Sequence, residues 1–207
     1  MDTKIVSRKD LNILVKALKE KKVIAFPTET VYGLGVVYDS LTAITALKKA
    51  KQRPENKPFT LMVSDKKVIH EFAEINQRDQ CLIDAFMPGA ITFIFNKKVN
   101  LADYITNGFS TIGIRYPNDP FVVRLIKEVN KPLLVPSANI SGMPPAFNHK
   151  EVIEQFDGEI EYVVEGECVS EVASTIIDLT TDEIKLIRQG EITMEQIRRV
   201  LNESGIG

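Results

Sequence analysis

The sequence predicts an α/β protein built on a twisted, mixed sheet flanked by helices. Short apolar runs with strand character, such as residues 23–26 and 90–95, alternate along the chain with segments that begin with helix caps. Such interleaving is typical of the α/β class. The chain has 207 residues, 44% of them apolar, and shows no internal repeat, so we expect one large domain over residues 1–207.

Helices are predicted where cap residues precede an apolar face. Ser7 with Asp10 indicates the first start, and Asp119 followed by Pro120 pairs an N-cap with a proline in the first turn. The other predicted helices run from Ser40 to about residue 49, over residues 76–86 before Pro88-Gly89, from Asn148 with Glu151 to residue 156, and onward from Thr193 with Gln196.

Strands are predicted at residues 23–26, 59–63, 90–95, 111–115, 133–136, 162–164, 174–179 and 184–188. The strand at 23–26 stops at Pro27 and opens into a polar loop, Thr28-Glu29-Thr30, that ends in glycines. Loops at strand ends are where α/β proteins place ligand sites. An ordinary strand-to-helix turn would carry the same residues, so this loop alone favours a site only mildly.

Bulk properties exclude several classes of function. The net charge of -2 and a pI near 5.8 give no global basic field for nucleic acid or membrane, so any anion site must be a local cluster. The N-terminus lacks the apolar core of a signal peptide and no apolar run approaches membrane-spanning length, so we expect a cytoplasmic protein. Cys81, Cys168, His70 and His149 are isolated, which argues against a disulfide framework or a protein-held metal.

Lys51 and Arg53 form the first candidate anion site. Pro54 forces Arg53 out of helical geometry, and an extended Lys51 would project to the same side, beside Lys57. Two cations held together are typical of a phosphate site. A solvated basic loop after a helix is the alternative, and for this segment taken alone it is the better interpretation.

Ser137 and Asn139 form the second candidate, directly after the apolar strand at 133–136. Small polar side chains with exposed backbone N–H groups make a neutral cradle for phosphate or carboxylate oxygens. A turn chosen for Ser, Asn and Gly chemistry explains the same residues.

Residues 111–115 alternate cleanly between two faces. Ile112 and Ile114 point toward a core, whereas Thr111, Gly113 and Arg115 share the opposite face. Gly113 would let a ligand approach the backbone, and Arg115 could hold a carboxylate through two hydrogen bonds. An exposed strand face with a surface arginine is an equally good interpretation.

Ser174 and Arg188 stand at the ends of two further strands and are ordinary when taken alone. The chain has no Walker loop, and Gly33-Leu34-Gly35 lacks the third glycine of a dinucleotide fingerprint. A bound nucleotide must therefore be held in another way.

The ordered motifs of the chain resemble the YrdC-like family of L-threonylcarbamoyladenylate synthases. The resemblance covers residues 24–192 and rests on these segments: Phe26-Pro-Thr-Glu-Thr-Val-Tyr-Gly-Leu-Gly35, Lys51-Gln-Arg-Pro54, Pro88-Gly-Ala-Ile-Thr92, Ile114-Arg-Tyr-Pro117, Pro136-Ser-Ala-Asn-Ile-Ser-Gly142, Ser174-Thr-Ile-Ile-Asp-Leu179 and Ile187-Arg-Gln-Gly-Glu-Ile192. It implies a twisted α/β fold around a deep, positively lined cavity.

The resemblance also implies an activity and a set of site residues. The family joins L-threonine, bicarbonate and ATP into threonylcarbamoyl-AMP and releases pyrophosphate, and the product feeds threonylcarbamoyladenosine modification of tRNA. The implied catalytic residues are Lys51, Arg53, Ser137 and Asn139; the threonine-binding residues are Thr28, Thr111, Arg115 and Ser174; the nucleotide-binding residues are Lys51, Arg53, Ser137 and Arg188. Mg²⁺ is expected mainly on the ATP phosphates. Proteins of a tRNA-modification complex are the expected partners.

Two features depart from the family pattern. Phe59-Thr60 replaces a more usual aliphatic pair, and Ala90 stands where proline is common. The run Phe59-Thr-Leu-Met62 resembles a paralogous branch of uncertain activity, against which the intact Ser137-Ala-Asn139 argues. The extra C-terminal domain of longer relatives is expected to be absent. A module that binds RNA or senses a nucleotide, without synthase activity, is the alternative function.

Overall fold

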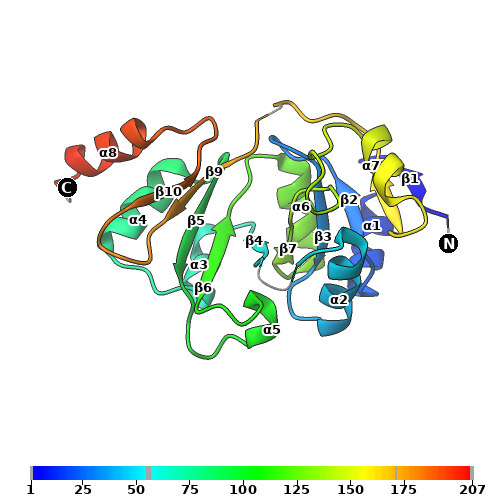
Figure 1. Cartoon of the computed structure of the whole chain (residues 1–207), viewed down its shortest axis with the longest axis horizontal. Coiled ribbons are helices and arrows are strands. Elements are labelled where there is room, and N and C mark those ends of the chain that lie inside the picture. Colours follow the sequence, from blue (N-terminus) through cyan, green and yellow to red (C-terminus); the bar gives the residue numbers. More distant parts are fainter. Residues whose placement is uncertain (1, 55–56, 171, 206–207) are drawn as a thin grey trace.

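The computed structural model describes residues 2–54, 57–170 and 172–205 as a mixed sheet with helices around it (Figure 1). The described strands are β1 (Lys4–Val6), β2 (Ile24–Phe26), β3 (Gly33–Val37), β4 (Thr60–Met62), β5 (Ile91–Asn96), β6 (Thr111–Arg115), β7 (Leu133–Leu134), β8 (Tyr162–Val164), β9 (Thr175–Asp178) and β10 (Lys185–Arg188). The described helices are α1 (Leu11–Lys19), α2 (Leu41–Lys51), α3 (Lys66–Phe72), α4 (Gln77–Phe86), α5 (Asp103–Thr106), α6 (Pro120–Val129), α7 (His149–Phe156) and α8 (Met194–Glu203).

The ten strands pair in the order β1-β8-β2-β3-β7-β4-β6-β5-β9-β10. The pairs β1–β8, β2–β8, β4–β6 and β5–β9 are parallel, and the remaining pairs are antiparallel. The predicted α/β class with a mixed sheet is therefore confirmed. Because β8 lies near one edge and β9 near the other, the segment between them crosses the molecule (Figure 1).

Five of the predicted helix starts are confirmed at their caps, namely those at Ser40, Asn76, Asp119, Asn148 and Thr193. The start predicted from Ser7 with Asp10 is displaced, because α1 begins at Leu11 and its N-cap Asp10 makes no side-chain cap hydrogen bond. Asp119 accepts hydrogen bonds from the backbone N–H groups of Phe121 and Val122, and Ser40 accepts one from Ala43. Asn76 and Thr193 each form a reciprocal capping box with the residue three positions on. These bonds satisfy backbone donors that lack partners in the first helical turn, which is why the starts could be read from local sequence.

Strand β3 is the main element that the sequence did not predict. Its glycines are not part of a loop: a Cβ on Gly33 would lie 2.4 Å from Val135 Cγ1, and one on Gly35 would lie 2.5 Å from Phe26 Cε1. Both glycines allow close packing inside the sheet. Their role was hidden because the atoms that they make room for belong to other segments.

Three other short elements, β1, α3 and α5, were not predicted either. Strand β1 has three residues and pairs only with β8, residues 162–164, from the other end of the chain. Helix α5 has four residues. Elements of this length give too little periodicity to be recognised without their partners.

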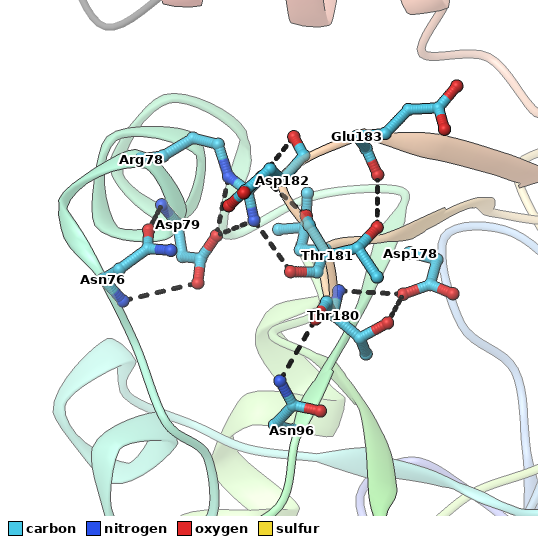
Figure 2. Close-up of polar contacts among 10 residues, drawn as sticks. Asn76, Arg78, Asp79, Asn96, Asp178, Thr180, Thr181, Asp182 and Glu183 are labelled. Carbon is cyan, nitrogen blue, oxygen red and sulfur yellow. Dashed lines mark hydrogen bonds and ion pairs between the residues drawn. The ribbon is translucent and has the colours of Figure 1, made fainter.

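Arg78 on α4 fixes the turn that joins β9 to β10 (Figure 2). Its Nη1 donates to the carbonyls of Thr181 and Asp182 at 2.8 and 2.9 Å, and its Nη2 donates to the carbonyl of Leu179 at 2.7 Å. Asp79 Oδ1 accepts hydrogen bonds from the same guanidinium and holds it in place. The outer hairpin of the sheet is thus attached to a helix as well as to β5.

Among the described residues, no helix has both the length and the apolar character that a bilayer crossing requires.

Candidate active site

A cavity of about 300 Å³ lies over one face of strands β4, β5 and β6. Its wall includes residues from the β2–β3 loop, from strands β3, β4, β5, β6, β9 and β10, and from the segments that follow α2 and β7. The lining residues are Thr28, Thr30, Val31, Tyr32, Gly33, Arg53, Pro58, Phe59, Thr60, Met62, Thr92, Ile94, Thr111, Gly113, Arg115, Val135, Pro136, Ser137, Ser174, Ile176, Ile187 and Arg188. Three arginines and several hydroxyl groups on an apolar background suit a small anionic ligand.

The floor of the cavity is the face of β6 that the sequence predicted. Thr111, Gly113 and Arg115 line the cavity, whereas Ile112 and Ile114 are buried on the opposite side. A Cβ on Gly113 would meet its nearest neighbour, Thr92 Cγ2, at 3.4 Å. The position therefore has room for a Cβ, unlike Gly33, where a Cβ would lie 2.4 Å from Val135 Cγ1.

Arg115 is nearly fully buried, with 4% of the residue exposed. Its Nη1 donates to Thr30 Oγ1 at 3.0 Å, and its Nη2 lies 2.9 Å from Glu29 Oε1. Its Nε and Nη2 make no hydrogen bond to any described residue, so the contact between Nη2 and Glu29 is an ion pair. The β2–β3 loop thus holds the guanidinium, while part of its hydrogen-bonding capacity is left unused.

Thr28 and Thr30 form the buried support of this loop. Thr28 Oγ1 donates to the carbonyl of Val31 at 2.8 Å and accepts from the backbone N–H of Thr30. The two hydroxyl oxygens lie 3.1 Å apart. A threonine pair with both side chains bonded within the loop presents its hydroxyls at fixed positions of the cavity wall.

Ser174 and Arg188, which looked ordinary in sequence, lie together. Arg188 Nε donates to the carbonyl of Ser174 at 2.9 Å, and its Nη2 donates to Ser174 Oγ at 3.1 Å. Burial lowers the pKa of Arg188, and the charge of Arg115 lowers this pKa further. The cavity therefore holds guanidinium groups that repel each other until an anion joins them.

The structure separates Lys51 from Arg53. The prediction of an extended Lys51 is wrong, because α2 continues through Lys51 and ends at Gln52, which has a φ of 47°. The constraint imposed by Pro54 acts on Arg53 alone. Arg53 lines the cavity, and Lys51 is not among the lining residues.

Lys51 is instead a buried link between α2 and the segment after β7. Only 1% of the residue is exposed, and its Nζ donates to the carbonyls of Ser137 and Asn139 at 2.6 and 2.7 Å. Burial lowers the pKa of the Lys51 amine to about 7, and the charges of Arg53 and Lys57 contribute. The amine holds the loop that carries Ser137.

Arg53 lies over the ring of Phe59, with its guanidinium carbon 4.7 Å from the ring centroid. Its Nε and Nη2 donate to the carbonyls of Lys57 and Pro58. Burial lowers the pKa of this guanidinium. Phe59 was noted in the sequence as a departure from the family pattern, and here it supports a cavity arginine.

Ser137 and Asn139 have different positions. Ser137 lines the cavity, whereas Asn139 is not among the lining residues. Asn139 Oδ1 accepts from Ser137 Oγ at 2.6 Å, and its Nδ2 donates to the carbonyls of Ile140 and Met143. A cradle of two side chains that both face a ligand is therefore not formed, because Asn139 is used within its own loop.

Several cavity residues escaped the sequence analysis. Thr60, Met62, Thr92 and Ile94 lie on β4 and β5, and alternation along those strands was the signal that could have found them. No group of three or more His, Cys, Asp or Glu side chains suited to a metal occurs in residues 2–54, 57–170 and 172–205.

Comparison with known proteins identifies the family. The model of the Sua5/YciO/YrdC family, described as "Telomere recombination", matches residues 16–190. The chain is 35% identical over 195 residues to the threonylcarbamoyl-AMP synthase of Pyrococcus abyssi, covering 93% of this chain and 57% of that protein. It is 36% identical to the Bacillus subtilis synthase over 89% of this chain and 54% of that one. This chain thus spans little more than half the length of these two relatives.

A relative of similar size and two solved structures complete the comparison. The putative threonylcarbamoyl-AMP synthase of Methanocaldococcus jannaschii is 33% identical, over 93% of this chain and 91% of that protein. The structure of P. abyssi Sua5 complexed with L-threonine superposes with a TM-score of 0.89 at 33% identity, over 98% of this chain and 61% of that one. E. coli YciO, at 22% identity and a TM-score of 0.85 over 95% of this chain and 98% of that one, shares the fold. The chain belongs to the Sua5/YciO/YrdC family.

Proposed function

We propose that this chain is a threonylcarbamoyl-AMP synthase, which joins L-threonine, bicarbonate and ATP and releases pyrophosphate. The observation that carries the proposal is the cavity wall, where Arg53, Arg115 and Arg188 face one space of about 300 Å³. Each of the three substrates carries at least one anionic group, so stabilising and positioning anions is the main task of such a site. The P. abyssi and B. subtilis relatives are both named threonylcarbamoyl-AMP synthase.

The reaction would proceed in two steps. The threonine amine attacks the carbon of bicarbonate, and loss of water gives a carbamate. A carbamate oxygen then attacks the α-phosphorus of ATP, the bond to the bridging oxygen of the β-phosphate breaks, and pyrophosphate leaves. Both steps bring anions together, so the cations of the cavity reduce the repulsion between the reactants.

Arg115 is the proposed partner of the threonine carboxylate. It is buried on the cavity floor, on the same face of β6 as Thr111, and its Nε makes no hydrogen bond to a described residue. A guanidinium offers two parallel donors to a carboxylate, which fixes the orientation of the amino acid. Thr28 and Ser174 supply hydroxyl groups to the same wall.

Arg53, Arg188 and Ser137 are the proposed contacts of ATP. Arg53 is partly buried and Arg188 lies on an exposed strand, and desolvation lowers the pKa of both guanidinium groups, so a bound phosphate would stabilise their charged forms. Lys51 and Asn139 do not contact ATP directly in this proposal. Their hydrogen bonds hold the loop that presents Ser137. Their contribution would be preorganisation of the site.

Mg²⁺ is proposed as the companion of the ATP phosphates. Among the described residues, the cavity lining offers hydroxyl and guanidinium groups and no carboxylate. A hard cation would therefore be held mainly by phosphate oxygens and water, and it would neutralise charge on the departing pyrophosphate. We further propose that the product serves threonylcarbamoyladenosine modification of tRNA in the cytoplasm, together with other proteins of that pathway.

Turnover with labelled ATP tests the proposal. The protein is incubated with ATP labelled at the α-phosphate, L-threonine, bicarbonate and Mg²⁺, and the products are separated. Pyrophosphate and a labelled AMP conjugate should form only when both threonine and bicarbonate are present. Formation of ADP and phosphate would contradict the mechanism, and ATP binding without any turnover would favour a nucleotide-sensing module. Binding of RNA without turnover would favour an RNA-binding module.

A further inference from the structure

Glu29 has an unusual environment next to the cavity. Its side chain is only 16% exposed, its Oε1 lies 2.9 Å from Arg115 Nη2, and the same oxygen accepts the backbone N–H of Asn118 at 2.8 Å. Its Oε2 is buried and has no hydrogen-bond partner among the described residues. One carboxylate oxygen thus joins the start of the β2–β3 loop, the segment after β6 and the buried arginine.

Glu29 contacts Arg115 but does not itself line the cavity. Arg115 is among the lining residues and Glu29 is not, so a ligand in the cavity meets the guanidinium. Within the described part of the chain, Glu29 is the one carboxylate ion-paired with a cavity arginine. Arg53 and Arg188 are held by carbonyl and hydroxyl oxygens instead.

The contacts of Arg115 are divided between two neighbouring residues. Thr30 accepts from Nη1 at 3.0 Å, and Glu29 pairs with Nη2. A long side chain held at both terminal nitrogens loses most of its rotamer freedom before a ligand arrives, which lowers the entropic cost of binding. Loss of Glu29 would leave Thr30 as the single acceptor and would release Nη2.

We infer that Glu29 is a positioning residue that orients Arg115 for the carboxylate of the amino-acid substrate. This inference rests on the proposed function, because it assigns that carboxylate to Arg115. Glu29 acts through Arg115 and touches no substrate. It belongs to neither the catalytic nor the nucleotide-binding residues.

A double-mutant cycle tests the inference by calorimetry. Glu29→Ala should weaken threonine binding about tenfold or more, the order expected for loss of a contact to a charged group, while ATP binding stays unchanged. The same substitution in an Arg115→Ala background should cause no further loss of threonine binding, because its target is gone. Additive losses in the double variant would overturn the inference, as would normal threonine binding by Glu29→Ala.

Two further variants separate positioning from general destabilisation. Glu29→Gln keeps an oxygen that can accept from Asn118 and Arg115, so it should recover most of the threonine affinity and KM that Glu29→Ala loses. Glu161→Ala is the matched control. The Glu161 side chain is also ion-paired and 17% exposed, and its Oε2 is buried without a hydrogen-bond partner among the described residues. Its partner is Lys22, and neither residue lines the cavity. Glu161→Ala should leave the threonine KM unchanged.

The remaining outcomes are also decisive. A Glu29→Gln variant as weak as Glu29→Ala, or equal losses of threonine and ATP affinity, would overturn the positioning role. A wild-type protein that fails to bind threonine would instead overturn the proposed function, so the two failures are distinguishable.

Discussion

The charge of the cavity wall comes from guanidinium groups that lie far apart in the sequence. Arg53, Arg115 and Arg188 are each held by at least two oxygen acceptors of the protein. Donors that are fixed before the substrate binds need no reorganisation during the reaction, which is the condition for electrostatic catalysis. At the scale of single residues, the site is therefore defined by what holds each cation in place.

Lys51→Ala and Arg53→Ala should differ in their effect on stability. Lys51 is buried and donates to two main-chain carbonyls, so its loss leaves buried acceptors unsatisfied, at a cost of roughly 1–3 kcal/mol in the free energy of unfolding. Arg53→Ala should lower activity at least tenfold with little change in stability, since its carbonyl partners lie near the surface.

Urea unfolding and steady-state kinetics on both variants check this difference. Equal stabilities for the two variants would contradict the structural role of Lys51. The burial of Lys51 already distinguishes it from the extended lysine beside Arg53 that the sequence suggested.

Gly113→Val should abolish the amino-acid subsite while the fold survives. The nearest atom to a new Cβ is Thr92 Cγ2 at 3.4 Å, so the first carbon fits, and valine favours a strand. The branched methyl groups would then occupy cavity volume beside Arg115. Threonine affinity should fall at least tenfold by calorimetry, with ATP affinity retained. A folded variant that binds threonine normally would place the pocket elsewhere.

At the scale of elements, the β9–β10 hairpin has two attachments. It pairs with β5 along β9, and its turn is tied to α4 by Arg78 (Figure 2). Ser174 and Arg188, at the other end of the hairpin, belong to the cavity wall. The position of this wall therefore depends on a helix that itself does not line the cavity.

Arg78→Ala should loosen the hairpin. It removes three hydrogen bonds to main-chain carbonyls from a side chain that is 13% exposed, and we expect a loss of roughly 1–3 kcal/mol in unfolding free energy. Backbone amides of β9 and β10 should exchange with solvent faster than those of β2. Arg199→Ala is the control, because its pair with Glu195 is exposed and is worth little. If the amide exchange rates of β9 and β10 do not change in Arg78→Ala, Arg78 does not hold the hairpin in place.

At the scale of the whole molecule, the cavity joins strands from both halves of the sheet. Its wall takes residues from β3 and β4 near the centre and from β9 and β10 at one edge. A ligand in this space contacts segments from both halves of the sheet. Binding should therefore stabilise the entire fold.

Threonine and ATP should each raise the melting temperature. At a hundredfold excess over Kd a ligand adds about 2.7 kcal/mol, which for a domain of this size corresponds to roughly 5–10 °C. Arg115→Ala should lose the response to threonine and keep the response to ATP. Differential scanning fluorimetry measures both shifts. A threonine response that is intact in Arg115→Ala would remove Arg115 from the carboxylate site.

Local sequence determined those features that depend on near neighbours. Caps such as Asp119-Pro120 place helix starts because the bonds that they satisfy lie within one turn. The alternation of residues 111–115 assigned Arg115 and Gly113 to one face because side chains on a strand point alternately to its two sides. The fold class and the floor of the cavity could therefore be predicted without coordinates.

Only the tertiary structure decided how the cations are arranged. Lys51 and Arg53 are two residues apart, yet one is buried against the loop after β7 and the other lines the cavity. The contact of Glu29 with Arg115 spans 86 residues of sequence, and the glycines of β3 make room for side chains from other segments. Such contacts follow from the packing of distant segments, which periodicity and propensity within one segment do not encode.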